Sequence, residues 1–488
     1  MNVLFMNGPS QDKSDRLFGL PTSLLYAIAP SVQAMNNGLL DAQYYPTVFD
    51  PWVCTDENYS AVKDALCSIV ENENINILCV SSTYDDVYPI LRLLSAVKQK
   101  FPETVIIVGG PHFDELTDLP EYRNEAIGID KPVDFIIAGD GEILLLELLQ
   151  SLSRGSVDIL QVARRSSGRG WIYDAHGNVA SVSTLLNLNG LPFLPVELSA
   201  NQHRQDFDIF MQGNEVVPTA QMIAMRGCPE FCIYCSERKG LAYPNHRSIE
   251  NIMGEISLRK AQGYGAVFFD DSTFGAYPHI NDLLVELRQT GMQFGCLNRF
   301  DRIQTPDVLE KFSRAGFTYM YCSIEHFNPK TLNMMGKGQS IEHIKTSLKL
   351  FEGSPIKLGV PLMFGFEYET ESSIKATLDF TAEWAAKGAI ILVGQSLLTF
   401  HPGTPEGKSP LARRIISAGG GFNRPYLHTG YPWDQFEESG FYHHKHVNAD
   451  HVAHIAEWSN DRLEKVLIRN RQSPAYKGKE KNNTASIE

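Results

Sequence analysis

The feature that most constrains the fold is an alternation of short apolar runs with amphipathic helical stretches, which occurs twice along the 488-residue chain. In the first 150 residues the pattern predicts helices at 59–70 and 86–100 and strands at 2–6, 41–49, 75–80, 104–108 and 133–137. Apolar runs without polar alternation are typical of strands that are buried on both faces. Residues 1–150 are therefore predicted to form a doubly wound, Rossmann-like parallel sheet, which makes the chain an α/β protein.

The second alternation begins at Gln221 and predicts strands near 221–225, 265–270, 292–298, 317–324, 356–364 and 389–399. Six β/α units are fewer than the eight of a complete barrel, so residues 221–405 are expected to form a partial (β/α)6 barrel with its chemistry at the carboxyl ends of the strands. Residues 151–220 are expected to be a connector containing a small hairpin at 171–182. Residues 406–488 are expected to form a mainly helical C-terminal region, with a helix near 449–468 and a disordered tail.

Composition narrows the class of partner. The net charge is −14 and no basic stripe is present, which argues against a nucleic-acid partner. The N-terminus does not have the pattern of a signal peptide, and no run approaches about 18 apolar residues, so no membrane partner is expected. These features predict a cytoplasmic protein that acts on a small-molecule substrate.

Three of the eight cysteines crowd into one short segment, where Cys228, Cys232 and Cys235 form a C-x3-C-x2-C motif directly after the first strand of the second alternation. Three thiolates on one loop can bind three irons of a 4Fe-4S cluster and leave the fourth iron open to a chelating amino acid group. A structural zinc site is the alternative, but zinc normally takes four ligands and no second pair lies nearby. The remaining cysteines have apolar surroundings and are predicted to be buried packing residues: Cys54, Cys67, Cys79, Cys296 and Cys322.

This motif, with Tyr234 just before its last cysteine, resembles the signature of the radical S-adenosylmethionine (SAM) superfamily. Phe268–Phe274, Cys322–Glu325 and Lys337-Gly338 are similar to further segments of that family. The resemblance implies a 4Fe-4S cluster on the three cysteines and SAM close to Tyr234, Asp270 and Glu325. It also implies an external electron donor such as flavodoxin or ferredoxin. Asp270 could instead cap the next helix, and Glu325 could be a structural ion-pair partner.

Three loops follow strands of the N-terminal sheet, and all are rich in glycine or small hydroxyl residues. A single loop of this kind is explained by a tight β/α turn, but small residues at these edges also let a bulky ligand approach the backbone. Together the loops resemble the cobalamin-binding domain of cobalamin-dependent radical SAM enzymes. The residues that match that domain are Ser82, Thr83, Gly109, Gly110, Pro111, His112, Asp140, Gly141 and Glu142. Because the D-x-H-x-x-G motif is absent, His112 is expected to be a tail contact at best and not the cobalt ligand.

The resemblance implies a methyltransferase. A 5′-deoxyadenosyl radical would abstract hydrogen from an unactivated centre of a small biosynthetic intermediate, which would then take a methyl group from methylcobalamin. A cyclase or rearrangement enzyme with the same cofactors is the main alternative. A radical enzyme without cobalamin and a cobalamin-holding sensor are weaker ones. The C-terminal segments 428–433 and 442–446 could shape the substrate pocket or be structural.

Overall fold

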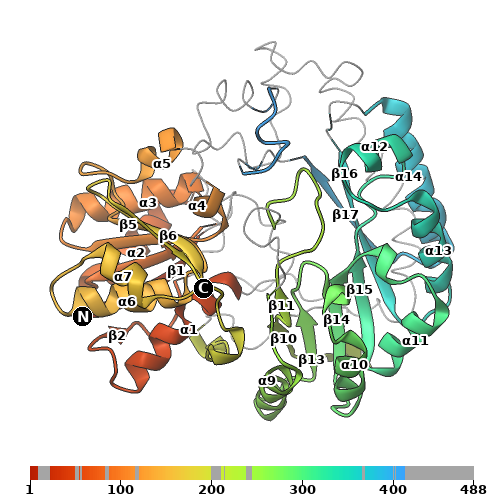
Figure 1. The fold of residues 1–488 in the computed structure, drawn as a ribbon, viewed down its shortest axis with the longest axis horizontal. Helices are drawn as coiled ribbons and strands as arrows, with labels where there is room; N and C mark the ends of the chain where they lie inside the picture. Colours follow the sequence, from red (N-terminus) through yellow and green to blue (C-terminus); the bar gives the residue numbers. More distant parts are fainter. Residues whose placement is uncertain are drawn as a thin grey trace. The chain divides into compact units, whose positions relative to one another are not determined.

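The structure is a computed structural model, and it describes residues 1–8, 22–49, 54, 58–82, 87–115, 120–198, 210–213, 215–237, 245–364, 366, 369–398, 401, 403–410 and 412. These residues fall into two compact units, built mainly from residues 1–198 and from 210–234 with 246–398 (Figure 1). The segments 428–433 and 442–446 and the helix expected near 449–468 lie outside the described residues.

The first unit is built on a seven-stranded sheet with the order β2-β1-β3-β4-β5-β6-β7. Its parallel part consists of β1 (Asn2–Asn7), β2 (Gln43–Tyr44), β3 (Ile77–Ser81), β4 (Val105–Gly109) and β5 (Phe135–Gly139). The helices are α1 (Thr22–Asn36), α2 (Tyr59–Asn72), α3 (Val87–Lys100), α4 (Pro111–Glu115), α5 (Pro120–Ala126), α6 (Glu142–Ser153) and α7 (Ile159–Arg165). Helix α1 packs with α6, and α2 packs with α3, which confirms the doubly wound arrangement.

Two features of this sheet differ from the expected pattern. The strand expected at 41–49 is reduced to Gln43–Tyr44 and one bridge between Phe49 and Met6. After the N–H of Tyr45 donates to Val3, the next donor to β1 is Phe49, because residues 46–48 leave the ladder and the Val48 N–H donates to the Leu198 carbonyl instead. The expected hairpin is confirmed as β6 (Arg169–Asp174) and β7 (Val179–Ser183). Since β6 pairs antiparallel with β5, the hairpin extends the first sheet.

The second unit contains a six-stranded, fully parallel sheet with the order β10-β13-β14-β15-β16-β17. The strands are β10 (Thr219–Met222), β13 (Ala266–Phe269), β14 (Gln293–Asn298), β15 (Phe317–Cys322), β16 (Lys357–Phe364) and β17 (Leu392–Leu397). Between them lie α9 (Ile249–Ala261), α10 (Ile280–Arg288), α11 (Pro306–Arg314), α12 (Pro329–Met334), α13 (Ile341–Phe351) and α14 (Glu371–Ala386). Because β10 and β17 stand at the two edges, the barrel is open, as predicted.

Short elements complete the described part of the chain. They are the strands β8 (Met211–Gln212), β9 (Glu215–Val216), β11 (Met225–Arg226) and β12 (Asn245–His246) and the 3-10 helices η3 (Leu188–Gly190), η4 (Val196–Leu198), η5 (Phe274–Ala276) and η6 (Phe300–Arg302). Within the described residues, no helix is both long enough and apolar enough to cross a membrane.

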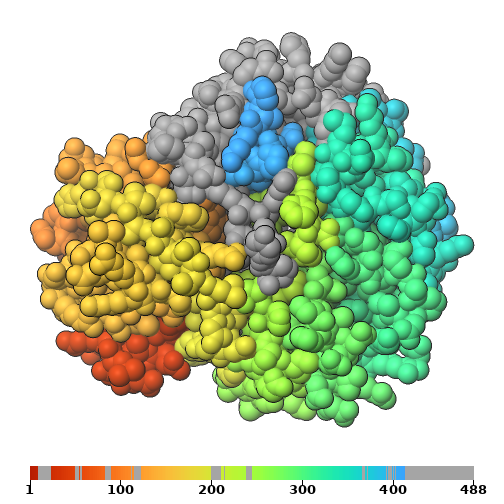
Figure 2. Space-filling model, in the orientation of Figure 1, coloured from red at the N-terminus to blue at the C-terminus, as the bar shows by residue number. Residues whose placement is uncertain are grey.

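Except for α10, whose N-cap His279 makes no such bond, the described α-helices of the second unit begin at residues whose side chains accept backbone hydrogen bonds. These N-caps are Ser248, Thr305, Asn328, Ser340 and Thr370. Such caps satisfy amide groups that have no partner inside the helix, so they set where each helix starts and how long each strand-to-helix loop is. The helices of this unit form the closely packed green to cyan surface of Figure 2.

An aromatic cluster holds the middle strands of the barrel. Phe269 stacks on Phe274 with ring centroids 4.4 Å apart, and Phe317 meets Phe312 of α11 edge-on at 4.9 Å. Aromatic pairs of this kind add to the stabilisation that area burial provides. The cluster therefore fixes the loop between β13 and η5, which faces the cysteine loop described next.

Candidate functional site

The cysteine loop follows β10 and β11, at the carboxyl end of the first barrel strand. Cys232 is buried, whereas Cys228 and Cys235 are partly exposed, and none of the three forms a disulfide. Cys228 Sγ lies 3.5 Å from Thr273 Oγ1. Burial raises the pKa of Cys228, although hydrogen bonds from Thr273 and from the Glu230 backbone act in the opposite direction.

The donor set of this loop fits an iron–sulfur cluster. Within the described ranges, no three His, Cys, Asp or Glu side chains converge closely enough to hold a single metal ion. A mononuclear zinc site needs such convergence, whereas a cubane binds each thiolate at a different iron. Three cysteines on one loop that form no disulfide, with no fourth thiol in the motif, therefore match a cluster that keeps one iron open.

A buried carboxylate anchors the start of this loop. Asp271, two residues beyond the end of the second barrel strand, accepts hydrogen bonds from the backbone N–H groups of Ala224 (3.0 Å to Oδ2) and Met225 (2.6 Å to Oδ1). Burial raises the pKa of Asp271 to about 7, against the lowering effect of these two bonds. The contacts tie the turn before the cysteines to the neighbouring strand.

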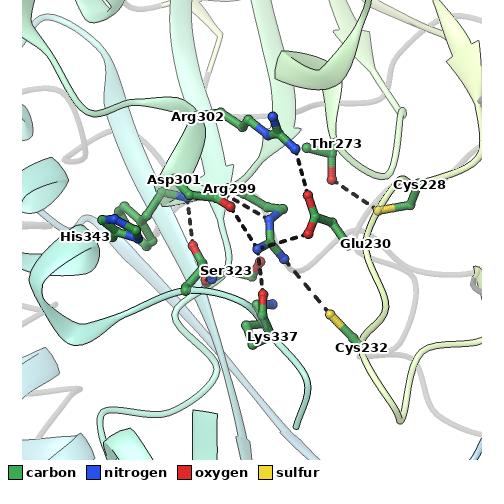
Figure 3. A network of polar contacts seen from close by, with 12 residues as sticks. Cys228, Glu230, Cys232, Thr273, Arg299, Asp301, Arg302, Ser323, Lys337 and His343 are labelled. Atoms are coloured by element: carbon green, nitrogen blue, oxygen red, sulfur yellow. Dashed lines mark hydrogen bonds and ion pairs between the residues drawn. The ribbon is translucent and has the colours of Figure 1, made fainter. Parts of the chain in front are cut away.

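Arg299 lies beside the cysteine loop, immediately after β14. Its Nε and Nη2 each donate to a carboxylate oxygen of Asp301 at 3.0 Å, and Nη2 also donates to the Lys337 carbonyl at 2.6 Å. Nη1 lies 4.0 Å from Cys232 Sγ. Figure 3 shows the guanidinium between this sulfur and the carboxylates of Asp301 and Glu230. The loop thus has a fixed positive group next to one of its thiols.

The segment Met335–Gly338 packs against the other side of the cysteine loop. The N–H of Ile233 donates to the Met335 carbonyl at 2.9 Å. Gly336 has φ +65°, and a Cβ built there would lie 3.0 Å from the Phe231 carbonyl oxygen. This segment therefore approaches the cysteine loop closely, and at Gly336 both the left-handed backbone and the tight contact favour glycine.

Lys337 extends from this segment to a buried polar group. Its Nζ lies 2.8 Å from Glu325 Oε1 and 3.3 Å from the Tyr234 hydroxyl, and that hydroxyl donates to Glu325 at 3.2 Å. Glu325 has φ +60°, a conformation that non-glycine residues rarely adopt. Its backbone is held there by hydrogen bonds with Pro361 and Met363 of β16. Strained residues of this kind persist where the surroundings over-determine them, and they cluster at functional sites.

The structure brings together two of the three residues that the sequence places near SAM. Tyr234 and Glu325 are in contact, as described above, whereas Asp270 lies at the end of β13 and its N–H donates to the Met222 carbonyl. Sequence reasoning missed Arg299 and Glu230. Glu230 could have been found, because it lies between two closely spaced cysteines, and a charge that is partly buried beside them needs a partner of opposite charge.

The five other cysteines are buried, as predicted. Cys79, Cys296 and Cys322 lie in apolar interiors, and burial raises the pKa of each thiol. These groups therefore remain protonated and act as packing residues.

Candidate cofactor residues of the first unit lie at the carboxyl ends of three neighbouring strands. Ser82 follows β3, Gly110 and Pro111 follow β4, and Asp140, Gly141 and Glu142 follow β5, with Gly109 as the last residue of β4. Thr83 and the side chain of His112 lie outside the described residues. The structure therefore places the described candidates along one edge of one sheet.

The glycines of this edge have a structural cause of their own. Gly110 has φ +97°, and a Cβ there would lie 2.6 Å from the Ser82 carbonyl oxygen. Gly139 has φ +89°, and a Cβ there would meet the Arg169 backbone. At these two positions the glycine is required by tight turns and close backbone packing, which was the alternative explanation for a single loop.

Comparisons with known proteins concern the sequence and the fold. The sequence profile of the radical SAM superfamily matches residues 222–381. An uncharacterized methyltransferase of Pyrococcus horikoshii is 24% identical over 366 residues, which cover 72% of this chain and 72% of that protein. An anaerobic magnesium-protoporphyrin IX monomethyl ester cyclase of Rubrivivax gelatinosus is 24% identical over 305 residues, 61% of this chain and 52% of the cyclase.

Solved structures share the fold over most of the chain. The radical SAM methyltransferase TsrM from Kitasatospora setae, solved with tryptophan substrate and a SAM analogue, superposes with a TM-score of 0.60 at 16% identity, covering 85% of this chain and 76% of TsrM. The cobalamin-dependent SAM radical enzyme OxsB, solved with aqua-cobalamin, gives a TM-score of 0.55 at 14% identity, covering 88% of this chain and 58% of OxsB. Residues 222–381 therefore match the radical SAM superfamily, and most of the chain shares its fold with the radical SAM methyltransferase TsrM and the cobalamin-dependent SAM radical enzyme OxsB.

Proposed function

We propose that the chain is a cobalamin-dependent methyltransferase that transfers a methyl group to an unactivated centre of a small-molecule biosynthetic intermediate. The observation that carries the radical part of this proposal is the cysteine loop at the end of β10, with the Tyr234–Glu325–Lys337 group beside it. The fold shared with TsrM and the methyltransferase relative support the choice of methyl transfer.

In this proposal Cys228, Cys232 and Cys235 hold the 4Fe-4S cluster, and Tyr234, Asp270 and Glu325 lie near SAM. When bound, the cluster and SAM would supply the 5′-deoxyadenosyl radical, and methylcobalamin would supply the methyl group. The chain contributes a buried polar group for binding SAM. Glu325 offers a carboxylate to the amino or hydroxyl groups of SAM, and Lys337 keeps that carboxylate paired until SAM binds.

Cobalamin is proposed to bind at the carboxyl edge of the first sheet, along the loops after β3, β4 and β5. The contact residues proposed are Ser82, Thr83, Gly109, Gly110, Pro111, His112, Asp140, Gly141 and Glu142. Asp140 is already oriented at this edge, because its Oδ2 accepts a hydrogen bond from the Arg169 N–H at 2.9 Å. Ligands of open α/β sheets characteristically bind beyond the carboxyl ends of the strands.

The test is anaerobic reconstitution of the protein with iron, sulfide and cobalamin, followed by incubation with SAM, a reductant and candidate pathway intermediates. Formation of 5′-deoxyadenosine together with S-adenosylhomocysteine, and a product heavier by one methylene, supports methyl transfer. The Cys228→Ala/Cys232→Ala/Cys235→Ala variant is the matched control and should form no 5′-deoxyadenosine. A reconstituted protein with no corrinoid absorbance would contradict the cobalamin assignment.

A second candidate function is cyclisation or rearrangement with the same cofactors. The relative from Rubrivivax gelatinosus, a cyclase, favours it. Product mass separates the two candidates, because cyclisation or rearrangement adds no methylene. A product of unchanged carbon count, formed with 5′-deoxyadenosine and without S-adenosylhomocysteine, would replace the methyltransferase proposal with this one.

The partners follow from the same chemistry. A one-electron donor such as flavodoxin or ferredoxin is proposed to reduce the cluster, in a cytoplasmic setting. Replacing the chemical reductant by reduced flavodoxin, and in a second assay by reduced ferredoxin, tests this proposal, and an absence of 5′-deoxyadenosine with both carrier proteins would contradict it.

A further inference from the structure

Arg299 is a buried cation that the proposed function leaves without a role. Its side chain is only 4% exposed. Burying a charge costs free energy unless the charge is paired and hydrogen-bonded. Arg299 meets this condition with Asp301, Glu230 and the Lys337 carbonyl.

These contacts aim the guanidinium. Asp301 takes both Nε and Nη2 in a two-point contact, which holds the plane of the group, and the Lys337 carbonyl takes Nη2 as well. The remaining nitrogen, Nη1, faces Cys232. Among the described residues its hydrogen-bond contact is Cys232 Sγ, at 4.0 Å. The orientation of the group is thus set by its carboxylate and carbonyl partners, with one nitrogen directed at a proposed cluster ligand (Figure 3).

The charge of Arg299 is part of a small network of two arginines and two carboxylates. Glu230 accepts a hydrogen bond from Arg302 at 2.7 Å and lies 3.4 Å from Arg299, so the two arginines share its carboxylate. Arg299 also pairs with Asp301. Arg302 is 37% exposed and contacts Glu230, whereas Arg299 is the buried member that reaches the thiol. The two arginines and the two carboxylates have no net charge together. Cys232 is nevertheless exposed to positive charge, because the Arg299 guanidinium is the member of the network that lies next to its sulfur.

We propose that Arg299 acts through Cys232 to raise the reduction potential of the 4Fe-4S cluster, by donating Nη1–H to the Cys232 thiolate. This inference rests on the proposed cluster site. One electron from an external reductant adds one negative charge to the cluster and its thiolates, and no proton is required. A donor and a positive charge beside a ligand sulfur stabilise the reduced form more than the oxidised form. Radical SAM chemistry needs the reduced form, so the contact favours the first step.

The experiment compares Arg299→Gln with the parent and with Arg302→Gln, in an anaerobic redox titration followed by the electron paramagnetic resonance signal of the reduced cluster. For Arg299→Gln we expect at least a tenfold lower ratio of reduced to oxidised cluster at a given ambient potential, equivalent to a midpoint about 59 mV more negative for one electron. Arg302→Gln removes a charge from the same network without a Cys232 contact, and its midpoint should stay close to that of the parent.

Arg299→Lys provides the conservative variant. It keeps the positive charge, so it should recover part of the midpoint shift, which a role in packing alone would not predict. Equal midpoints for Arg299→Gln, Arg299→Lys and the parent would overturn the inference.

A measurement on the unaltered sequence covers the case in which Arg299→Gln fails to fold or to take up iron. Protein grown with guanidino-15N arginine, loaded and reduced in the absence of SAM, should show 15N hyperfine coupling to the cluster. Absence of that coupling would overturn the inference while leaving the cluster assignment intact. Failure of the unaltered protein to bind iron and sulfide would instead contradict the proposed function, so the two failures are distinguishable.

Discussion

At the scale of single residues, Asp271 connects the second barrel strand to the turn before the cysteines. Replacing Asp271 by Ala leaves the N–H groups of Ala224 and Met225 buried without their acceptor, at a cost of about 1–3 kcal/mol for each unsatisfied group. We expect a lower melting temperature and less iron bound per chain after reconstitution. Asp282→Ala, an exposed position on α10, is the control. Equal melting temperatures and iron contents for the two variants would contradict the anchoring role.

His326, next to the strained Glu325, predicts a pH dependence. Its Nδ1 accepts from the Asn328 N–H, its Nε2 lies 3.4 Å from Glu369, and burial lowers the pKa of the imidazole to about 3. As the pH falls below 6.5, the ordinary histidine value, the unfolded chain binds a proton that the native chain does not. His326 therefore contributes stability that is fully present above this pH and is lost as the pH falls toward the folded pKa.

The variant His326→Asn tests this pH dependence, because Asn keeps an acceptor for the Asn328 amide but does not titrate. We expect the parent to lose up to about 2 kcal/mol more stability than the variant between about pH 6.5 and about pH 5. Urea unfolding at several pH values measures the difference. Parallel stability curves for the two proteins would show that His326 binds its proton over the same pH range in the folded and the unfolded chain, and would contradict the lowered pKa.

At the scale of elements, the segment Met335–Gly338 holds the cysteine loop in place. Gly336→Ala forces a Cβ to 3.0 Å from the Phe231 carbonyl oxygen and strains a left-handed backbone. Gly353→Ala is a matched control, because φ there is +71° but a Cβ would meet nothing within 4 Å. Both variants should lose about 1–2 kcal/mol from backbone strain. Only Gly336→Ala should also lose iron, measured per chain after reconstitution, and equal iron retention would contradict the role of this segment.

The strands and helices were the predictable part of this molecule. The six barrel strands lie close to their expected ranges, because a strand buried on both faces appears in the sequence as an apolar run between turn residues. The strand expected at 41–49 was wrong for most of its length, because residues 46–48 leave the ladder and Val48 donates to Leu198, a contact distant in sequence that the apolar pattern does not report. The hairpin was predicted, but its pairing with β5 depends on which sheet edge is open.

The site was predictable only where its parts are close in sequence. The spacing of the three cysteines is a property of one loop, so it could be read directly. Arg299 and Cys232 are separated by 67 positions, and Lys337 and Tyr234 by 103, so these contacts form only when the barrel folds. No local sequence pattern encodes such contacts, since in the sequence Arg299 and Lys337 look like ordinary surface charges.

At the scale of the whole molecule, the two units are proposed to bind different cofactors, and this can be tested by removing each site separately. The variant Cys228→Ala/Cys232→Ala/Cys235→Ala should lose iron and 5′-deoxyadenosine formation while it keeps the corrinoid absorbance. Gly110→Val should lose the corrinoid absorbance while it keeps iron and 5′-deoxyadenosine formation. The reason is that a branched side chain at φ +97° collides with the Ser82 backbone at the carboxyl edge of the first sheet.

The control for the second variant is Gly38→Val, which is equally strained at φ +69° but meets nothing within 4 Å, and it should keep both cofactors. Iron analysis, corrinoid absorbance and 5′-deoxyadenosine are measured on all variants after the same anaerobic reconstitution. A cobalamin-holding sensor predicts that function survives loss of the cysteines, whereas a radical enzyme without cobalamin predicts no corrinoid in any variant. Loss of iron from Gly110→Val, with Gly38→Val unaffected, would show that the two sites do not load independently, and the assignment of one cofactor to each unit would have to be abandoned.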